Sequence, residues 1–165
     1  MGNKEDLTLT LTMIMEPQHA NLFGNVHGGE IMRFMDTTAG CTAIKYTKKP
    51  CVAARVDEFQ FLKPIHVGSL VTSKGTIVYT GNTSLEIRVT VDIENLMDSD
   101  STHRAIEAFF TYVALDEDGK PTPVPPYVPE TAREIELSEY VKQRREFDLQ
   151  RREAAKARKE NQNKE

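Results

Sequence analysis

The sequence lacks several features that would place it in a specialised class of protein. Among its 165 residues there is no tryptophan, and only Cys41 and Cys51 are cysteines. Two cysteines do not suffice for the disulfide framework of a small secreted domain. No apolar run approaches the roughly 18 residues that span a bilayer, and the polar residues 1–6 show no secretory signal. We therefore expect a cytoplasmic chain without a disulfide scaffold or a membrane anchor.

The sequence also lacks a large excess of charge of one sign. Its 21 Lys and Arg against 25 Asp and Glu give a formal net charge of -4, and its mean hydropathy is -0.48. The charge argues against a nucleic-acid-binding protein that depends on bulk positive charge. Apolar residues make up 39% of the chain, enough for a real but modest core. At roughly 100–200 residues per domain, the length predicts one domain with room for an appendage.

Composition divides the chain into three parts. We expect a folded body over 1–120, a Pro-rich linker or surface strap over 121–129, and a charged helical tail over 130–165. The middle part holds five of the eight prolines, which favour extended backbone and cannot continue a helix. In the tail a helix is predicted from about Thr131, with the end after Gln150 frayed or solvated. Its role is open between a solvated charged helix and a docking or subunit contact.

Alternating apolar residues predict a body built mainly of strands. The strongest signal is a ten-residue run in which every second residue is apolar, and Gly81-Asn82 marks a hairpin turn before it. The last run is nearly continuously apolar, as in a central strand covered on both faces. We predict strands over residues 7–15, 52–62, 67–80, 85–94 and 105–115.

One segment breaks the strand pattern. Residues 28–46 contain no proline and place apolar side chains around nearly the whole circumference of a helix. A helix that is apolar on almost all sides is a buried one, and on it Cys41 is expected to be a small apolar filler. An antiparallel sheet wrapped around this helix buries it economically, so the pattern predicts an α+β fold.

Residues able to carry chemistry gather around the start of this helix. Gly24, Gly28 and Gly29 mark a backbone that turns tightly or approaches something closely. The helix N-terminus that follows offers free N–H groups and the positive end of the helix dipole to a negative oxygen. The segment lacks the glycine pattern of a dinucleotide site and the Lys-Ser/Thr of a P-loop. The histidines and cysteines form no metal-ligand pattern, so no metal is expected.

Asp36 lies inside the predicted apolar helix, a little over two turns after Gly28. A buried carboxylate costs free energy unless it is hydrogen-bonded or opens into a cleft. It is either a structural residue satisfied by the backbone, Thr37 or Thr38, or a general base or nucleophile. Asn21, fifteen residues earlier, is either a turn residue or one that orients a water or a substrate oxygen. His27 is likewise either a packed loop residue or an acid or base.

The run from Asn21 to Asp36 resembles the acyl-coenzyme A thioesterases of the hotdog-fold superfamily. The most similar group is the cytosolic acyl-CoA hydrolases, related to brain acyl-CoA hydrolase and to bacterial short-chain enzymes. The resemblance covers about residues 7–127 and implies a long buried helix wrapped by an antiparallel sheet of about five or six strands. The charged C-terminal helix that the composition predicts lies outside it. Further stretches that fit the family are 56–65, 81–84 and 110–121.

The resemblance implies an enzyme that hydrolyses acyl-CoA to a free fatty acid and coenzyme A, with no cofactor. It implies that Asp36 is the catalytic carboxylate, as general base or nucleophile, and that Asn21 reaches it from the opposite subunit of a dimer. Gly28 is implied as the backbone N–H that polarises the thioester carbonyl, with Gly29 or His27 as alternatives. The dimers are implied to assemble further into trimers of dimers, that is, hexamers.

The coenzyme arm is implied to run along the subunit interface. Arg55 and Arg88 are candidates for the phosphates, and Thr83 and Ser84 for other polar contacts. Phe59 is a candidate for the acyl chain, together with Phe23 and Met32. The complete set of candidate substrate contacts is Gly29, His27, Arg55, Phe59, Thr83, Ser84 and Arg88.

Two other interpretations stay open. The first is an acyl-CoA sensor on the same fold that binds the ester without cleaving it. Such a sensor normally carries a DNA-binding domain, for which this chain has neither the length nor a basic helix-turn-helix. The second is a dehydratase or hydratase of the same superfamily, which uses a histidine in a different motif. The pair Asn21 and Asp36 favours the thioesterase, with acyl-CoA and further copies of the chain as partners, and no nucleic acid or membrane.

Overall fold

The computed structural model describes residues 7–98 and 102–162. Residues 1–6, on which the expectation of no secretory signal was based, lie outside the described residues. The chain divides into two compact units, one that ends at Tyr127 and one that begins at Val128. In chain order the elements are β1 (Thr8–Ile14), a 3-10 turn (Pro17–His19), α1 (Gly28–Thr47), β2 (Cys51–Phe61), β3 (Leu70–Thr80), β4 (Ser84–Glu94), β5 (His103–Ala114) and α2 (Ala132–Gln162).

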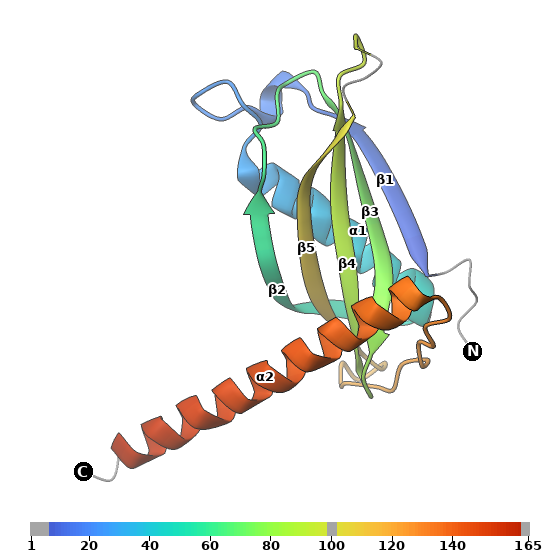
Figure 1. Ribbon diagram of the computed structural model, residues 1–165, viewed down its shortest axis with the longest axis vertical. Helices are drawn as coiled ribbons and strands as arrows, with labels where there is room; N and C mark the ends of the chain where they lie inside the picture. The colour runs from blue at the N-terminus through green and yellow to red at the C-terminus, as the bar shows by residue number, and fades with distance from the viewer. Residues whose placement is uncertain (1–6, 99–101, 163–165) are drawn as a thin grey trace. The chain divides into compact units, whose positions relative to one another are not determined.

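The strands form one antiparallel sheet in the order β1-β3-β4-β5-β2, so β1 and β2 are its edges (Figure 1). The predicted strands are all present, and β3 and β4 are joined by the predicted hairpin, in which the Gly81 N–H donates to the Ser84 carbonyl at 2.8 Å. Strand β3 begins at Leu70, three residues later than predicted. The reason is a turn at Gly68, whose φ of 90° lies in the left-handed region that favours glycine.

Helix α1 crosses one face of the sheet and forms the core with it (Figure 1). At Gly75 of β3 an added Cβ would collide with the side chain of Thr42, so glycine lets the helix lie this close. In β4 every second residue from Leu85 to Ile93 is buried, as the alternation predicts. Other large side chains that are fully buried are Met15, Ile31, Met35, Ile77, Ile106 and Phe110.

The helix is buried on one side only, which corrects the expectation that it is buried all round. Its inner face includes Met35, which is fully buried, whereas Met32 is 44% exposed and Ile44 is 48% exposed. Cys41 is also exposed, so the expectation of a small apolar filler is wrong. The physical reason is that the sheet of one chain covers one side of α1 and leaves the other side open. An apolar pattern on a helix does not show whether its own chain or another one covers each side.

The Pro-rich segment is a strap on the first unit up to Tyr127. It is extended, and its backbone is tied to the β3–β4 hairpin: the Val124 N–H donates to the Asn82 carbonyl at 3.0 Å, and the Tyr127 N–H to Oγ1 of Thr80 at 2.8 Å. Lys49 Nζ, after the end of α1, donates to a strap carbonyl at 2.9 Å. These bonds satisfy backbone groups that proline leaves without a ladder partner.

Helix α2 begins after Thr131, as predicted. The Glu134 N–H donates to Oγ1 of Thr131 at 3.2 Å, and the Glu134 carboxylate accepts from the Thr131 N–H at 2.9 Å, which is a capping box. The helix runs past Gln150 to Gln162, so of the two expectations for this end, fraying is wrong and solvation stays a prediction. Its last turns are rich in Glu, Ala, Lys and Arg, which are strong helix formers. Neither helix of the described chain combines the length and apolar content of a membrane span.

Candidate active site

The start of α1 carries one backbone amide that is not hydrogen-bonded. The His27 N–H donates to the His19 carbonyl at 2.7 Å, and the Glu30 N–H donates to the His27 carbonyl at 2.9 Å. His27 caps the helix, and its Nδ1 accepts the Gly29 N–H at 2.9 Å. Among the described residues, the Gly28 N–H has no hydrogen-bond partner. Of the three amides that the sequence left open, Gly28 is therefore the one available to a substrate oxygen.

An aromatic wall stands beside this amide. An added Cβ at Gly28 would lie 2.8 Å from Cζ of Phe61, so the ring of Phe61 rests against the glycine. Phe59 packs edge-on against that ring, with centroids 5.0 Å apart. The predicted Phe59 thus lies near the helix start, and Phe61, which the sequence analysis did not single out, lies closer. Its place at the end of β2, two residues from Phe59, was the available signal.

Asp36 is exposed, and its carboxylate has a partner that the sequence did not predict. The hydroxyl of Tyr112, on β5, lies 2.6 Å from Oδ1 of Asp36 and 2.9 Å from the Asp36 carbonyl oxygen. The hydroxyls of Thr37 and Thr38 donate instead to backbone carbonyls one turn earlier, so neither satisfies the carboxylate. Burial, and then the hydrogen bond and charge of Asp36, raise the pKa of Tyr112 well above its usual value. The phenol is therefore a donor at neutral pH.

Asn21 lies in the loop before α1 and organises that loop. Its side-chain Oδ1 accepts the Phe23 N–H at 2.8 Å and the Asn25 N–H at 3.3 Å. Gly24, with a φ of 79°, completes the tight turn, and its N–H donates to the Asn21 carbonyl at 3.1 Å. Within the described chain the side chains of Asn21 and Asp36 make no hydrogen bond to one another. A turn role for Asn21 is thus present in one chain.

The candidate phosphate contacts lie on the other face of the sheet. Val89 is paired with Gly75 and faces α1, so its neighbour Arg88 faces away. Arg88 donates to the Glu107 carboxylate at 2.7 and 2.8 Å, and this pairing raises the pKa of the guanidinium. Arg55 lies 2.7 Å from Asp57. Both cations are therefore paired with carboxylates away from the helix start.

Thr83 and Ser84 lie at the far end of the sheet from Gly28. Ser84 is paired with Val113 of β5, whereas Phe61, which touches Gly28, is paired with Ile106. Seven residues of strand at about 3.4 Å each separate the two levels by about 24 Å. One chain does not bring these polar residues to the helix start.

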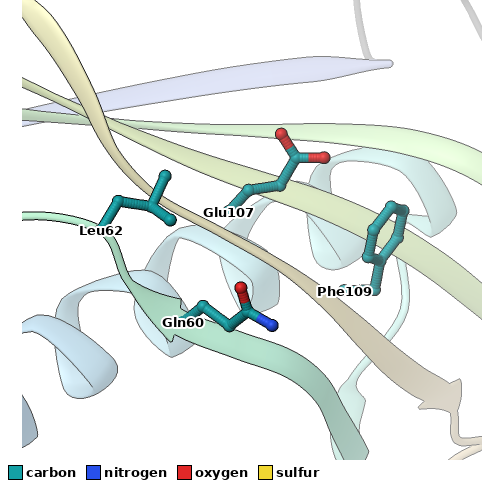
Figure 2. Close-up of a pocket in the computed structure, with 4 residues that line it drawn as sticks. All are labelled: Gln60, Leu62, Glu107 and Phe109. Atoms are coloured by element: carbon teal, nitrogen blue, oxygen red, sulfur yellow. The ribbon is translucent and has the colours of Figure 1, made fainter.

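A pocket of about 190 Å³ opens on the face of the sheet that is turned away from α1 (Figure 2). It is lined by Gln60, Leu62, Glu107 and Phe109, whose side chains in Figure 2 stand in front of the strands with α1 behind. The carboxylate of Glu107 in this pocket is paired with Arg88. Because the pocket lies on the face of the sheet opposite α1, it is separate from Asp36 and Gly28. Across the described residues, no three His, Cys, Asp or Glu side chains gather as metal ligands.

Comparison with known proteins identifies the family. Residues 23–98 match the thioesterase superfamily. The cytosolic acyl coenzyme A thioester hydrolase of Rattus norvegicus is 43% identical over 126 residues, which are 76% of this chain and 33% of that protein. A solved apo-hexameric acyl-CoA thioesterase is 33% identical, with a TM-score of 0.84 over 89% of this chain and 94% of that one. The chain belongs to the thioesterase superfamily.

The fold of this thioesterase-superfamily chain is the hotdog fold, so the predicted α+β architecture is confirmed. The chain spans about a third of the length of the mammalian hydrolases that it matches. The acyl-CoA hydrolase of Staphylococcus aureus, solved with butyryl coenzyme A, coenzyme A and coenzyme A disulfide, is 31% identical, with a TM-score of 0.79 over 92% of this chain and 90% of that one. Its solved alanine variants replace an asparagine, an aspartate fifteen positions later, and a threonine seventeen positions further on.

Proposed function

We propose that this chain hydrolyses acyl-CoA thioesters to a carboxylic acid and coenzyme A. The observation that carries the proposal is that α1 presents both an unbonded amide, at Gly28, and an exposed carboxylate, at Asp36. An amide donor and a carboxylate are the two groups that hydrolysis of a thioester requires. The names of the relatives, acyl-CoA thioester hydrolases, point to the same chemistry.

In the proposed reaction the thioester carbonyl accepts the Gly28 N–H at the positive end of α1. This donor stabilises the oxyanion of the tetrahedral intermediate, and one such donor is commonly worth about 3–4 kcal/mol. Asp36 removes a proton from the attacking water, or attacks the carbonyl itself to give an anhydride that water then opens. In either route a C–O bond forms, the C–S bond breaks, and coenzyme A leaves as a thiolate that takes up the released proton.

The two groups belong to different subunits in this proposal. The eight residues from Gly28 to Asp36, at 1.5 Å rise each, put about 12 Å between them along the helix axis. A carbonyl that both groups contact needs each within about 3 Å. One chain does not achieve this, whereas two copies related by a dyad can bring Gly28 and Asn21 of one chain to Asp36 of the other.

The free surfaces of the chain support such a dimer. The outer side of α1 exposes Met32 and Ile44, and β2 is a sheet edge with Val52 and Val56 exposed. An uncovered edge strand with apolar side chains is a ready site for pairing with another strand. We propose the dimer as the minimum active unit and trimers of dimers as the full assembly, in keeping with the hexameric thioesterase to which the chain is similar.

The spacing of the candidate residues supports the same roles. Asn21 and Asp36 are fifteen positions apart, as are the asparagine and aspartate replaced in the Staphylococcus aureus hydrolase. We retain Asn21 as the group that positions water or the carbonyl, which requires its side chain to serve both its own loop and the partner. Phe59 and Phe61 are proposed as the wall for the acyl chain. Arg55, Arg88, Thr83 and Ser84 stay predictions for coenzyme A, and the cytoplasm stays the predicted location.

The test is thiol release from acyl-CoA esters of increasing length, from acetyl to palmitoyl, by the wild type and by Asp36→Ala. We expect hydrolysis of some esters by the wild type and a loss of at least about a thousandfold in the variant, which should still fold and unfold cooperatively on heating. If the wild type binds the esters, measured by calorimetry, and releases no thiol, the chain is a sensor. Wild-type activity in folded Asp36→Ala would exclude the proposed role of the carboxylate.

A further inference from the structure

The contact between Tyr112 and Asp36 has the geometry of a strong hydrogen bond. Its 2.6 Å length falls in the range of an O–H donor bound to a charged carboxylate. Tyr112 is only 4% exposed, so its hydroxyl is presented from the core to an aspartate that is itself exposed. Such a donor restricts the rotation of the carboxylate and occupies one of its two oxygens. The other oxygen is left for a proton or a substrate atom.

The packing of α1 makes room for this contact. Gly40 lies one turn after Asp36 in the helix, and an added Cβ there would be 3.3 Å from the Tyr112 hydroxyl. A glycine inside a helix costs about 1 kcal/mol relative to alanine. The close approach of the phenol explains why a small residue stands at this position. On the strand side, Tyr112 is fixed in register between Leu85 of β4 and Ala53 of β2.

The residue opposite Tyr112 gives a second, independent observation. In the Staphylococcus aureus hydrolase a threonine seventeen positions after the aspartate was chosen for replacement, and the same spacing from Asp36 falls on Ala53. Directly paired residues of antiparallel strands point to the same face, so Ala53 and Tyr112 stand side by side on the α1 face. This chain thus has no hydroxyl at Ala53 and a phenol beside it that reaches Asp36.

We propose that Tyr112 is a positioning residue that holds the Asp36 carboxylate for the reaction, a role that rests on the proposed thioesterase function. The phenol donates to Oδ1 and keeps Oδ2 directed toward the attacking water or the carbonyl carbon. It does not touch the substrate itself. Because its donor hydrogen persists over the whole neutral range, the orientation of the carboxylate does not change with pH there.

Kinetics of Tyr112→Phe test the role, with Tyr46→Phe as a matched control. Tyr46 is also buried, at 3% exposure, and its hydroxyl donates to the Pro125 carbonyl at 3.3 Å, away from Asp36. We expect Tyr112→Phe to lower kcat by roughly 10- to 100-fold, the factor for losing a hydrogen bond to a charged group, with KM within about threefold. Tyr46→Phe should keep kcat. Equal kcat in Tyr112→Phe and the wild type would overturn the proposal.

A second measurement tests the contact without using activity. In protein labelled with ¹³C at tyrosine Cζ, the Tyr112 resonance is followed by NMR against pH in the wild type and in Asp36→Asn. The titratable groups that face this phenol are Asp36, Cys41 and Cys51, and only the first is changed. Removing the carboxylate charge should move ionisation of Tyr112 to lower pH. An unchanged titration would overturn the proposal even where the wild type hydrolyses acyl-CoA and Asp36→Ala does not.

Discussion

Two inactive variants of this chain should restore one another when they share a dimer. Helix geometry puts about 12 Å between Gly28 and Asp36, and the Asn21 side chain is bound within its own loop, so each proposed site combines two chains. In a dimer of Asn21→Ala with Asp36→Ala, one site receives both mutations and the other receives neither. Random assembly of equal amounts makes about half of the dimers mixed, each with one intact site, which gives about a quarter of wild-type activity.

The assay is thiol release after co-expression of the two variants with different affinity tags. Sequential purification on both tags isolates mixed assemblies. In a trimer of dimers about half of the dimers are mixed, so we expect about a quarter of the wild-type kcat per dimer, and about half if the chain stays dimeric. The controls are assemblies in which both tagged chains carry the same substitution. They are purified in the same way and should stay inactive. Mixed dimers no more active than these controls would show that Asn21 and Asp36 do not act across subunits, and the proposed shared site would be wrong.

Three further predictions concern the helix start, the core and a thiol. Gly28→Pro removes the amide hydrogen at the first position of the helix, which accepts proline. It should lower kcat about 100- to 1000-fold relative to Gly28→Ala, which keeps the hydrogen. Equal rates of the two variants would exclude the Gly28 N–H as the donor. Gly75→Ala should lower the free energy of unfolding in urea by about 1–3 kcal/mol. The loss should be smaller in a Thr42→Ala background, where the colliding hydroxyl is gone. If the losses of the two substitutions simply add, the two side chains do not collide. Burial raises the pKa of Cys51, and this lowers its thiolate fraction at pH 8. In a Cys41→Ser variant, Cys51 should therefore react with dithiobisnitrobenzoate far more slowly in the folded protein than after unfolding.

The fold was predictable because its signals are local. Alternation over 85–94 and 7–15 reports which face of a strand is buried, and the long apolar run from Gly28 reports a helix of about the observed length. Boundaries set by backbone geometry were less accessible, as at Gly68, where a left-handed turn delays β3. Helix α2 also runs further than its apolar content suggested, because its last turns are rich in Glu, Ala, Lys and Arg, which are strong helix formers.

The partners within the site were not predictable from spacing. Asp36 meets Tyr112 across 76 residues of sequence, through a register that no local pattern specifies. Likewise, the sequence placed three amides near the helix start. Gly28 is distinguished among them because the His27 N–H donates to the His19 carbonyl and the Gly29 N–H donates to Nδ1 of His27. Both features depend on how side chains are directed once strands and helix have packed. A single sequence shows the residue types and leaves these contacts open.

The proposed dimer would explain both the error about the buried helix and the division of the proposed site between two chains. The sequence pattern indicated a helix apolar on all sides, yet one chain covers only the side that contains Met35 and leaves Met32 and Ile44 exposed. The same helix holds the Gly28 amide and the Asp36 carboxylate too far apart to act on one carbonyl. A second copy on the open side would cover the apolar surface and complete the pair of groups in a single step. In the proposed dimer, burial of the outer face of α1 and formation of the site would therefore depend on the same contact.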